Sequence, residues 1–282
     1  MMDRNLLRLP LDESALRDEL IGTGSGWRQL DIVEHTGSTN ADLLERAACG
    51  LDIDGVVLIA EHQTAGRGRH GRGWSAAPRA QITMSVGVRV ADVPASAWGL
   101  LSLVTGLAVV ESVTPLLEGV PVEAGLKWPN DVIAGGGKLA GILAEVVRPF
   151  AVIGVGLNVT QAAEEVDGSG ATSLLDLGVA APDRHRLISR LLRKLGERIE
   201  IWRVARGADP KLAADYRAHS LTIGSRVRAL LPGGQEVVGT ARDIDDQGRL
   251  CLETGLEPTS ETGAGAVGQT VLVSAGDVVH LR

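Results

Sequence analysis

The sequence predicts an α+β protein in which hairpin strands are combined with helices. Two observations support this class: strand-length and helix-length apolar patterns are mixed over the first 220 residues, and strands near residue 135 are joined by a glycine turn. A third is the change to short β-like runs after residue 220. We therefore expect a short helical segment (1–29), a larger domain (30–220) and a small β domain (221–282).

Two short helices are expected near the start of the chain. Residues 12–21 place leucines on one side, and the glycine-rich residues 22–26 end the helix. A second helix is expected from Thr39, because Thr39 and Asp42 resemble a capping box and Gly50 suits a helix end.

The middle of the chain predicts strands around a buried helix. Residues 56–60 form a continuous apolar run, and residues 82–90 alternate apolar and polar, which is typical of a half-buried strand. Residues 98–110 are apolar but shorter than the ~20 residues of a membrane span, so we expect a buried helix. We therefore expect no membrane association.

Further along, residues 132–133 and 139–146 read as two strands joined by the glycines at 135–137, and residues 152–159 as another. Asp183 is expected to cap a helix that extends to Trp202. After residue 220, β-like runs at 227–231, 237–241, 250–252, 271–273 and 278–281 predict a small closed barrel. Residues 257–268 are rich in Gly, Thr and Ser and predict a mobile loop.

Charge and cysteine content exclude several classes of protein. The net charge is −7 and the pI about 5.4, so no global basic field attracts nucleic acid or an anionic membrane. Cys49 and Cys251 are too few for a disulfide framework and lack the paired spacing of a zinc site. Without a visible signal peptide, these features predict a reduced, cytoplasmic protein.

An Arg-Gly loop at residues 66–74 (GRGRHGRGW) is the strongest local signal. Its glycines give a flexible backbone, and its arginines provide planar forks for phosphate or carboxylate, which suits a loop that orders around an anion. A nucleic-acid contact is the alternative. A Walker P-loop is excluded because no Gly-Lys-Ser/Thr follows, and the match to a dinucleotide fingerprint is weak because a strand follows in place of a helix.

Lysines mark a second segment. The chain has only four lysines against many arginines, and two of them, Lys127 and Lys138, flank one short stretch. Lys and Arg differ in shape and donor geometry, so a retained Lys suggests that a compact ammonium is needed. With Asn130 and Asp131 between them, we expect a nucleotide site in which Asp131 faces Mg²⁺; a solvated surface patch is the alternative.

A third segment, residues 36–40 (TGSTN), is by itself a turn and helix cap, but a helix N-terminus can also bind a small polar ligand. Asn158 ends a strand and could be structural or functional. The six histidines show no metal-ligand spacing, and no serine lies in a nucleophile elbow. Zinc-enzyme and hydrolase hypotheses are therefore rejected.

Taken together, the motifs resemble those of the biotin protein ligases, which attach biotin to the carrier domain of biotin-dependent carboxylases. They occur in the family's order over about residues 30–180, and the β-rich tail is similar to its C-terminal domain. The matching segments are 37–40 (GSTN), 63–74 (QTAGRGRHGRGW), 127–131 (KWPND), 137–143 (GKLAGIL) and 154–158 (GVGLN).

The resemblance implies a catalytic domain similar to class II aminoacyl-tRNA synthetases, followed by an SH3-like barrel. It also implies that biotin and ATP form biotinyl-5′-AMP and pyrophosphate, after which biotin is transferred to a lysine of a biotin carboxyl carrier protein domain. The residues expected to bind biotin are Ser38, Thr39, Asn40, Gln63, Arg67, Gly68, Arg69, Lys138 and Gly141. Those expected to bind ATP or the adenylate are Arg69, Arg72, Trp74, Lys127, Asn130, Asp131 and Asn158.

Lys138 and Arg69 are expected to act in catalysis. Attack of a carboxylate on the α-phosphorus brings two anions together, so a fixed ammonium and Mg²⁺ lower the barrier. The resulting acyl phosphate hydrolyses if water reaches it, so an Arg-Gly loop able to close over it has a purpose. Because the motif at residue 36 begins early, we expect no regulatory DNA-binding domain and no specific DNA partner.

Two rival functions remain. A lipoate-type ligase would share the fold and the adenylate chemistry, although the Gly-Arg-Gly-Arg run argues against it. A nucleic-acid-binding module using the Arg-Gly loop is a more distant alternative, and binding to oligonucleotides that weakens steeply with salt would support it.

Overall fold

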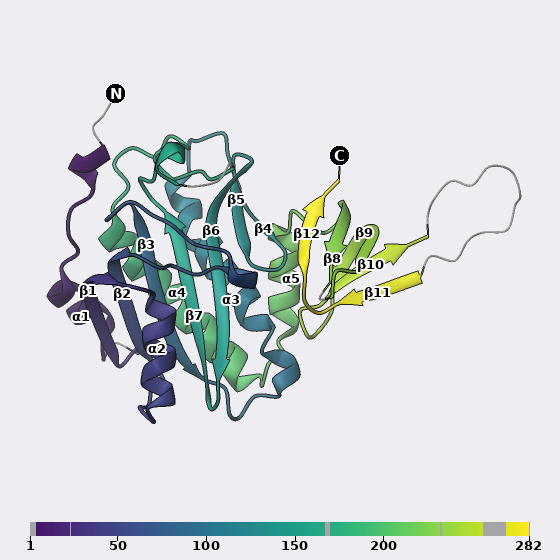
Figure 1. Ribbon diagram of the computed structural model, residues 1–282, viewed down its shortest axis with the longest axis horizontal. Helices are drawn as coiled ribbons and strands as arrows, with labels where there is room; N and C mark the ends of the chain where they lie inside the picture. Colours follow the sequence, from purple (N-terminus) through teal and green to yellow (C-terminus); the bar gives the residue numbers. More distant parts are fainter. Residues whose placement is uncertain (1–3, 23, 167–169, 232, 256–268, 282) are drawn as a thin grey trace, which may run out of the picture.

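A computed structural model describes residues 4–22, 24–166, 170–231, 233–255 and 269–281, and its strands form two sheets (Figure 1). The larger sheet has the order β1-β2-β3-β7-β6-β5-β4. Its β1 and β2 are parallel, and every other neighbouring pair is antiparallel. The predicted α+β class is confirmed. The strands are β1 (Gln29–Thr36), β2 (Val56–Gln63), β3 (Gln81–Arg89), β4 (Ala124–Lys127), β5 (Asp131–Ala134), β6 (Gly137–Val147) and β7 (Phe150–Asn158).

Helices cover both faces of this sheet. The α-helices are α1 (Glu13–Leu20), α2 (Thr39–Ala48), α3 (Leu100–Val113), α4 (Arg184–Val204) and α5 (Pro210–His219). The 3₁₀ turns are η1 (Arg4–Leu7), η2 (Arg69–Gly71), η3 (Ala95–Ala97), η4 (Thr114–Leu116) and η5 (Ala163–Glu165). Figure 1 shows α2 on one face and α3 and α4 on the other.

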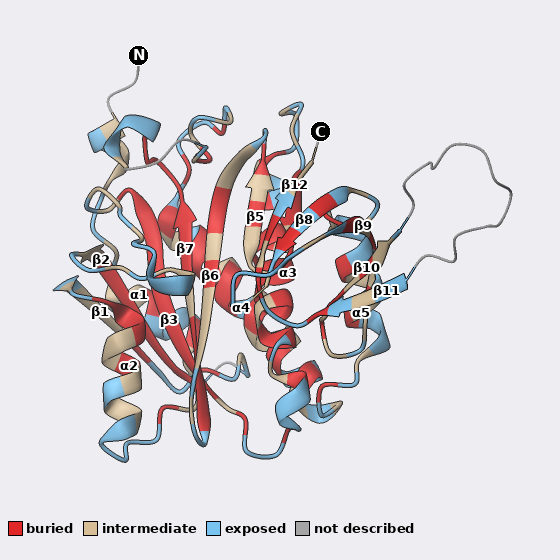
Figure 2. Cartoon of the chain, turned by 45° about the vertical axis from the view of Figure 1, so that its right-hand side comes forward, coloured by how far each residue is buried: buried red, intermediate tan, exposed pale blue. Residues whose placement is uncertain are grey.

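Successive side chains of β2 point to opposite faces of the sheet, which explains why the protein has two hydrophobic clusters. Val57 and Ile59 join the large cluster that contains the apolar residues of α1, α3 and α4, whereas Val56 and Leu58 join the smaller cluster under α2. The central strands are therefore buried on both sides, as Figure 2 shows for β3 and β7. Burial on both faces removes far more apolar surface from water than one covered face would.

The prediction that residues 82–90 form a half-buried strand was wrong in burial. The strand exists as β3, but its polar positions are buried too: Thr83 is 5% exposed and Ser85 is 0% exposed. The polar alternation marks a buried face under α2, where Ser85 finds hydrogen-bond partners, and not a solvent face.

Helix starts mostly follow the sequence signals. Asp183 caps α4 as predicted, and Asp12, for which no cap was predicted, caps α1. At α2 the predicted Thr39/Asp42 capping box was wrong: Ser38, which has an extended backbone, accepts from the N–H of Ala41. Asp42 instead accepts from the hydroxyl of Thr36 at 2.6 Å. The cap is therefore one residue earlier, which leaves Thr39 inside the first turn.

Helix α3 accounts for the apolar stretch at residues 98–110. On length and composition, the helical stretch Ala95–Leu116 could cross a membrane, yet 67% of its most apolar window is buried inside the protein. Nearly every residue of α3 packs against the sheet, α4 or the smaller domain. The predicted buried helix is confirmed.

The five predicted C-terminal strands are present and pair antiparallel in the order β11-β10-β9-β8-β12. Among the described residues β11 and β12 form no ladder with each other, so barrel closure stays a prediction, as does the domain boundary at residue 220. The predicted loop at 257–268 lies outside the described residues. The strands are β8 (Arg226–Leu230), β9 (Glu236–Ile244), β10 (Leu250–Thr254), β11 (Gln269–Val273) and β12 (Asp277–His280).

The smaller sheet is joined to the segment that follows β4. The backbone N–H of Trp128 donates to Thr222 Oγ1 at 3.0 Å, and its indole N–H donates to the carbonyl of Gly248 at 3.0 Å. His280 Nε2 lies 3.2 Å from the same Thr222 hydroxyl. The two hydrogen bonds of Trp128 fix the turn between β4 and β5 against the C-terminal domain.

His280 should make this junction sensitive to acid. Burial, together with the charge of Lys127, lowers the pKa of His280 below its ordinary value. The unfolded chain takes up this proton near pH 6.5 and the folded chain resists it, so stability should fall as pH drops below about 6.5. Urea denaturation between about pH 7.5 and about pH 5.5 should show a smaller loss for His280→Gln than for the wild type. Equal losses would exclude this role.

Candidate active site

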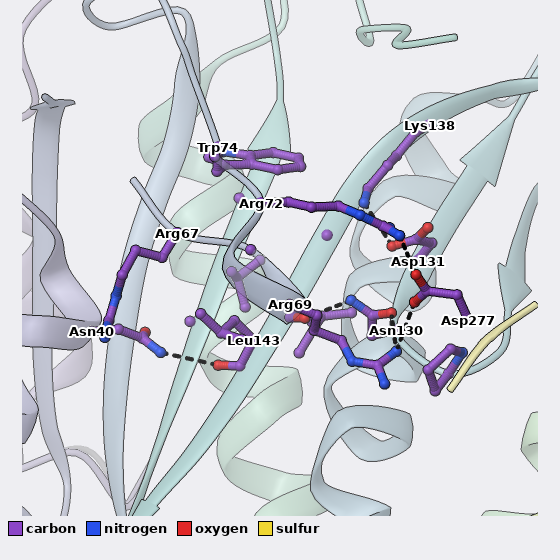
Figure 3. Close-up of a pocket in the computed structure, with 18 of the residues that line it drawn as sticks. Asn40, Arg67, Arg69, Arg72, Trp74, Asn130, Asp131, Lys138, Leu143 and Asp277 are labelled. Carbon is purple, nitrogen blue, oxygen red and sulfur yellow. Dashed lines mark hydrogen bonds and ion pairs between the residues drawn. The ribbon is translucent and has the colours of Figure 1, made fainter. Parts of the chain in front are cut away.

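One pocket of about 260 Å³ lies where α2, the Arg-Gly loop, strands β6 and β7 and the C-terminal sheet meet (Figure 3). It brings together segments that are far apart in the chain, and all but one of the predicted site residues line it. These are Ser38, Thr39, Asn40, Gln63, Arg67, Gly68, Arg69, Arg72, Trp74, Lys127, Asn130, Asp131, Lys138 and Gly141.

The end of the pocket at the N-terminus of α2 is a network of uncharged polar groups. Gln63 Oε1 accepts from the backbone N–H of Thr39 at 2.8 Å and lies 3.0 Å from the Thr39 hydroxyl. That hydroxyl is 2.6 Å from Ser85 Oγ, which donates to Asn40 Oδ1 at 2.6 Å. Thr39, Asn40 and Ser85 are almost fully buried. These bonds fix the side chains before any ligand arrives.

Glu145 connects this network to the Arg-Gly loop. Asn40 Nδ2 donates to the carbonyl of Leu143 at 3.2 Å and to Glu145 Oε2 at 2.9 Å. The same carboxylate oxygen accepts from Arg67 Nη2 at 3.0 Å. Figure 3 shows Asn40 and Arg67 together on one side of the pocket.

Trp74 occupies the middle of the pocket. Its indole N–H donates to Gln81 Oε1 at 2.8 Å, and its ring lies over two glycines, Gly141 and Gly156, where any side chain would collide with it. Lys138 Nζ lies 5.3 Å from the ring centroid, within cation–π range. Glycines on β6 and β7 therefore make the space that the indole fills.

Gly156→Ala should displace the Trp74 ring. A Cβ at this position would overlap the indole, so we expect a loss of about 1–3 kcal/mol in the free energy of unfolding. Acrylamide quenching of tryptophan fluorescence should increase, and this increase should vanish in a Trp74→Phe background. Unchanged quenching in Gly156→Ala would contradict this packing.

The opposite end of the pocket is cationic. Lys138 Nζ lies 2.7 Å from Asp131 Oδ1. Arg69 Nη1 donates to Asn130 Oδ1 and to the carbonyl of Gly276, both at 3.2 Å. Burial lowers the pKa of the Arg69 guanidinium, although Asp277 and Asp131 oppose that effect. The guanidinium nevertheless stays charged at neutral pH.

The Arg-Gly loop is folded back on the C-terminal sheet. The N–H of Gly68 donates to the carbonyl of Arg72 at 2.7 Å, and the N–H of Trp74 donates to that of Gly66 at 2.9 Å. Asp277 on β12 pairs with Arg72 and lies 3.7 Å from Arg69. Figure 3 shows Asp277 beside Arg69, Arg72 and Asp131.

Asn158, which was predicted to contact the nucleotide, is the one predicted site residue that lies outside the pocket lining. It is 3% exposed. Its Nδ2 donates to the carbonyls of Lys138 at 3.1 Å and Thr172 at 2.9 Å, and its Oδ1 accepts from Gln81 at 2.7 Å. The register of β7 against β3 turns the amide inward, where it supports the backbone of Lys138.

Sequence reasoning missed three residues that shape the site. Ser85 belongs to an alternating strand pattern that predicted a polar side facing solvent. Its side chain points to a role in the site only once the strand is known to be fully buried. Glu145 lies inside the predicted strand 139–146 and was not assigned a role. Asp277 had no local signal, because its partners lie more than 200 residues away in the sequence.

A resident metal site is not evident. Among the described residues there is no group of three or more His, Cys, Asp or Glu placed to hold a metal ion. Asp131 supplies a single carboxylate, which suits a Mg²⁺ that arrives with a nucleotide and keeps phosphate and water as its other ligands.

The arrangement suits a ligand with two chemically different ends. The network at α2 offers neutral donors and acceptors to a compact polar group. The other end of the pocket has the positive charges of Lys138, Arg69 and Arg72. These charges can hold a carboxylate and phosphates together, although the two anionic groups repel each other in water. The pocket can therefore hold two anions together and neutralise the charge that builds up between them.

Comparison with known proteins agrees with this chemistry. Residues 36–158 match the biotin/lipoate A/B protein ligase family, and residues 222–281 match the biotin protein ligase C-terminal domain. Over all 282 residues of both chains, the sequence is 72% identical to the biotin–[acetyl-CoA-carboxylase] ligase of Mycobacterium tuberculosis. It is 36% identical to the bifunctional ligase/repressor BirA of Escherichia coli over 77% of this chain and 66% of that one.

Solved structures share the fold. The biotin protein ligase of Aquifex aeolicus in complex with biotin and ATP superposes with a TM-score of 0.71 at 24% identity, covering 91% of this chain and 100% of that one. The ligase of Leishmania major in complex with biotinyl-5-AMP gives 0.56 at 23% identity, covering 90% and 99%. With sequence identity over its full length and both domains matched, the chain belongs to the biotin protein ligases.

Proposed function

We propose that this protein activates biotin with ATP to biotinyl-5′-AMP, releases pyrophosphate, and then transfers biotin to one lysine of a biotin carboxyl carrier protein domain. The observation that supports this most is the single pocket that joins the neutral network at Thr39 and Gln63 to the cations Lys138 and Arg69. The Aquifex ligase holds biotin and ATP, and the Leishmania ligase holds the adenylate.

In this proposal the ureido ring of biotin binds at the α2 end, among Ser38, Thr39 and Gln63. The valeryl chain then passes Trp74, and its carboxylate reaches Lys138. Lys138 exchanges its ion pair with Asp131 for the biotin carboxylate and the α-phosphate, which frees Asp131 to face the Mg²⁺ of MgATP. Mg²⁺ bound with the nucleotide supplies further neutralisation of phosphate charge.

The Arg-Gly loop would close over the adenylate. Arg69 and Arg72, now paired with Asp277, are placed to exchange that carboxylate for phosphate oxygens. A closed loop excludes water from the acyl phosphate until a carrier lysine attacks the acyl carbon and AMP leaves. The cytoplasm is the expected compartment.

The test is incubation with biotin, MgATP and a purified carrier domain, followed by intact mass spectrometry of the carrier. Addition of one biotinyl group that requires both biotin and ATP is expected. The same reaction with lipoate should leave the carrier unmodified. Preferential transfer of lipoate, or no transfer of biotin with a carrier that another biotin ligase modifies, would overturn the proposal.

A further inference from the structure

The first described residues form an N-terminal strap (residues 4–11) that the proposed reaction does not use. Its Arg8 side chain is only 9% exposed. Arg8 donates to both carboxylate oxygens of Glu165, at 2.9 and 2.7 Å, and to the carbonyl of Thr160 at 3.0 Å. Arg4 pairs with Asp176 and donates to the same carbonyl at 3.1 Å. A guanidinium buried to this extent is costly unless its partners are held in place.

A second anchor holds the strap to the core. Arg184 on α4 and Glu61 on β2 form an ion pair of 2.7 Å, and both side chains are at least 96% buried. Arg184 Nη2 donates to the carbonyl of Leu9 at 2.6 Å, and the N–H of Leu11 donates to Glu61 at 2.7 Å. The strap is therefore part of the folded protein, at the edge of the sheet near β1 in Figure 1.

The residues that the strap contacts lead directly to the active site. Thr160 follows Asn158, whose side chain holds the carbonyl of Lys138. Further along the same segment, the carbonyl of Gly170 accepts from the N–H of Lys138 at 2.6 Å, and the N–H of Thr172 donates to the carbonyl of Lys138 at 3.0 Å. Both backbone groups of Lys138 are thus bound by described residues that lie close in the chain to Thr160 and Asp176, which Arg8 and Arg4 hold.

A second route runs from the strap to Trp74. Glu165 also accepts from Gln161 Nε2 at 2.9 Å, and Gln161 Oε1 accepts from the N–H of Ala77 at 2.8 Å. Ala77 lies three residues after Trp74, at the end of the Arg-Gly loop. Through the Glu165 carboxylate, Arg8 is therefore connected to Gln161 and, through Gln161, to the segment that follows Trp74.

We propose that Arg8 is a positioning residue for the adenylation step. The strap holds the segment after β7 against β6, so that Lys138 and Trp74 stay where the carboxylate and the α-phosphate meet. The biotin end of the pocket rests on the N-terminus of α2, whose bonds to Gln63 and Ser85 involve no residue of the strap. This inference rests on the proposed function for its kinetic effect, but its structural part is independent of it.

The test compares Arg8→Ala and Arg8→Lys with the wild type, with Arg28→Ala as a matched control. Arg28 is bound to Asp52 and Asp54 and contacts none of the segments described above. In Arg8→Ala we expect kcat for biotin-dependent ATP–pyrophosphate exchange to fall about tenfold, with KM for biotin unchanged, because a small displacement of a catalytic group is costly. Arg8→Lys should recover only part of kcat, since an ammonium cannot bind Glu165 with a fork of two donors.

Amide hydrogen exchange provides the readout that does not depend on activity. The N–H groups of Lys138 and Thr172 should exchange faster in Arg8→Ala, while those in α2 stay protected as in the wild type and Arg28→Ala. Unchanged protection and unchanged kcat in Arg8→Ala would overturn the inference, as would a uniform loss of protection. If Arg8→Ala does not fold, Arg8→Lys is judged by the same two readouts. Absence of exchange activity in the wild type would refute the proposed function alone.

Discussion

Lys138→Ala is expected to abolish biotin-dependent ATP–pyrophosphate exchange, with a loss of at least about a hundredfold in kcat. Lys138 carries the ammonium that would lie between the biotin carboxylate and the α-phosphate. Its Nζ is fixed by Asp131 and faces the ring of Trp74. Removing it leaves two anions to meet without that neutralisation.

The fold should survive this substitution. The Lys138–Asp131 pair is about a third exposed on the lysine side, and such pairs contribute about 1 kcal/mol or less to stability. Lys194→Ala is the matched control, because Lys194 pairs with Glu197 at 3.0 Å on the surface of α4. Near-normal exchange in a folded Lys138→Ala protein would exclude the proposed role. Lys138→Arg should also be impaired, because a planar fork does not replace a compact ammonium.

Arg69→Gly should release the adenylate prematurely. Arg69 is anchored by Asn130, by the carbonyl of Gly276 and by Asp277, so its loss removes these three contacts and leaves only Arg72 of the two arginines paired with Asp277. A hydrogen bond to a charged group contributes about 1.5–3 kcal/mol. Losing one such bond to the adenylate should therefore raise its dissociation rate by about ten- to a hundredfold. Free biotinyl-AMP would then biotinylate exposed amines without a carrier.

Retention of the intermediate on a filter, or by native mass spectrometry, measures this effect. Arg79→Gly is a suitable control, because Arg79 lies outside the pocket, pairs with Glu34 and has a positive φ of 60° that glycine adopts readily. Equal retention in Arg69→Gly and the wild type would count against a closing loop.

Elements with strong local patterns were predictable from the sequence. The hairpin of β5 and β6 was signalled by glycines that take φ values of 57° and 78° at Gly135 and Gly136. Helix α1 was signalled by its leucine face and the glycines that follow it, and α4 by the Asp183 cap and a 3.6-residue period. In each case the pattern depends on contacts within a few residues, so tertiary structure had little to change.

Strands β1 and β4 and helix α5 were not predicted. Strand β1 carries Asp31 and Glu34 beside its apolar residues, and these charges are neutralised by arginines from elsewhere: Arg17 and Arg46 bind Asp31, and Arg79 binds Glu34. Strand β4 has only four residues. Such elements are stabilised by their neighbours in space, so their own residues give a weak signal.

The sequence by itself determined the chemical inventory of this protein: a loop of arginines and glycines, two retained lysines, a capped polar turn, and the mixed sheet that would carry them. Only the tertiary structure decided which of these meet. It turned Asn158 inward to support Lys138, brought Asp277 of the C-terminal sheet to Arg69 and Arg72, and bound Arg8 to the segment behind the site. The reason is physical, because each of these contacts joins residues that are distant in the chain. Their pairing depends on strand register and on how the layers pack, neither of which is written in a local pattern.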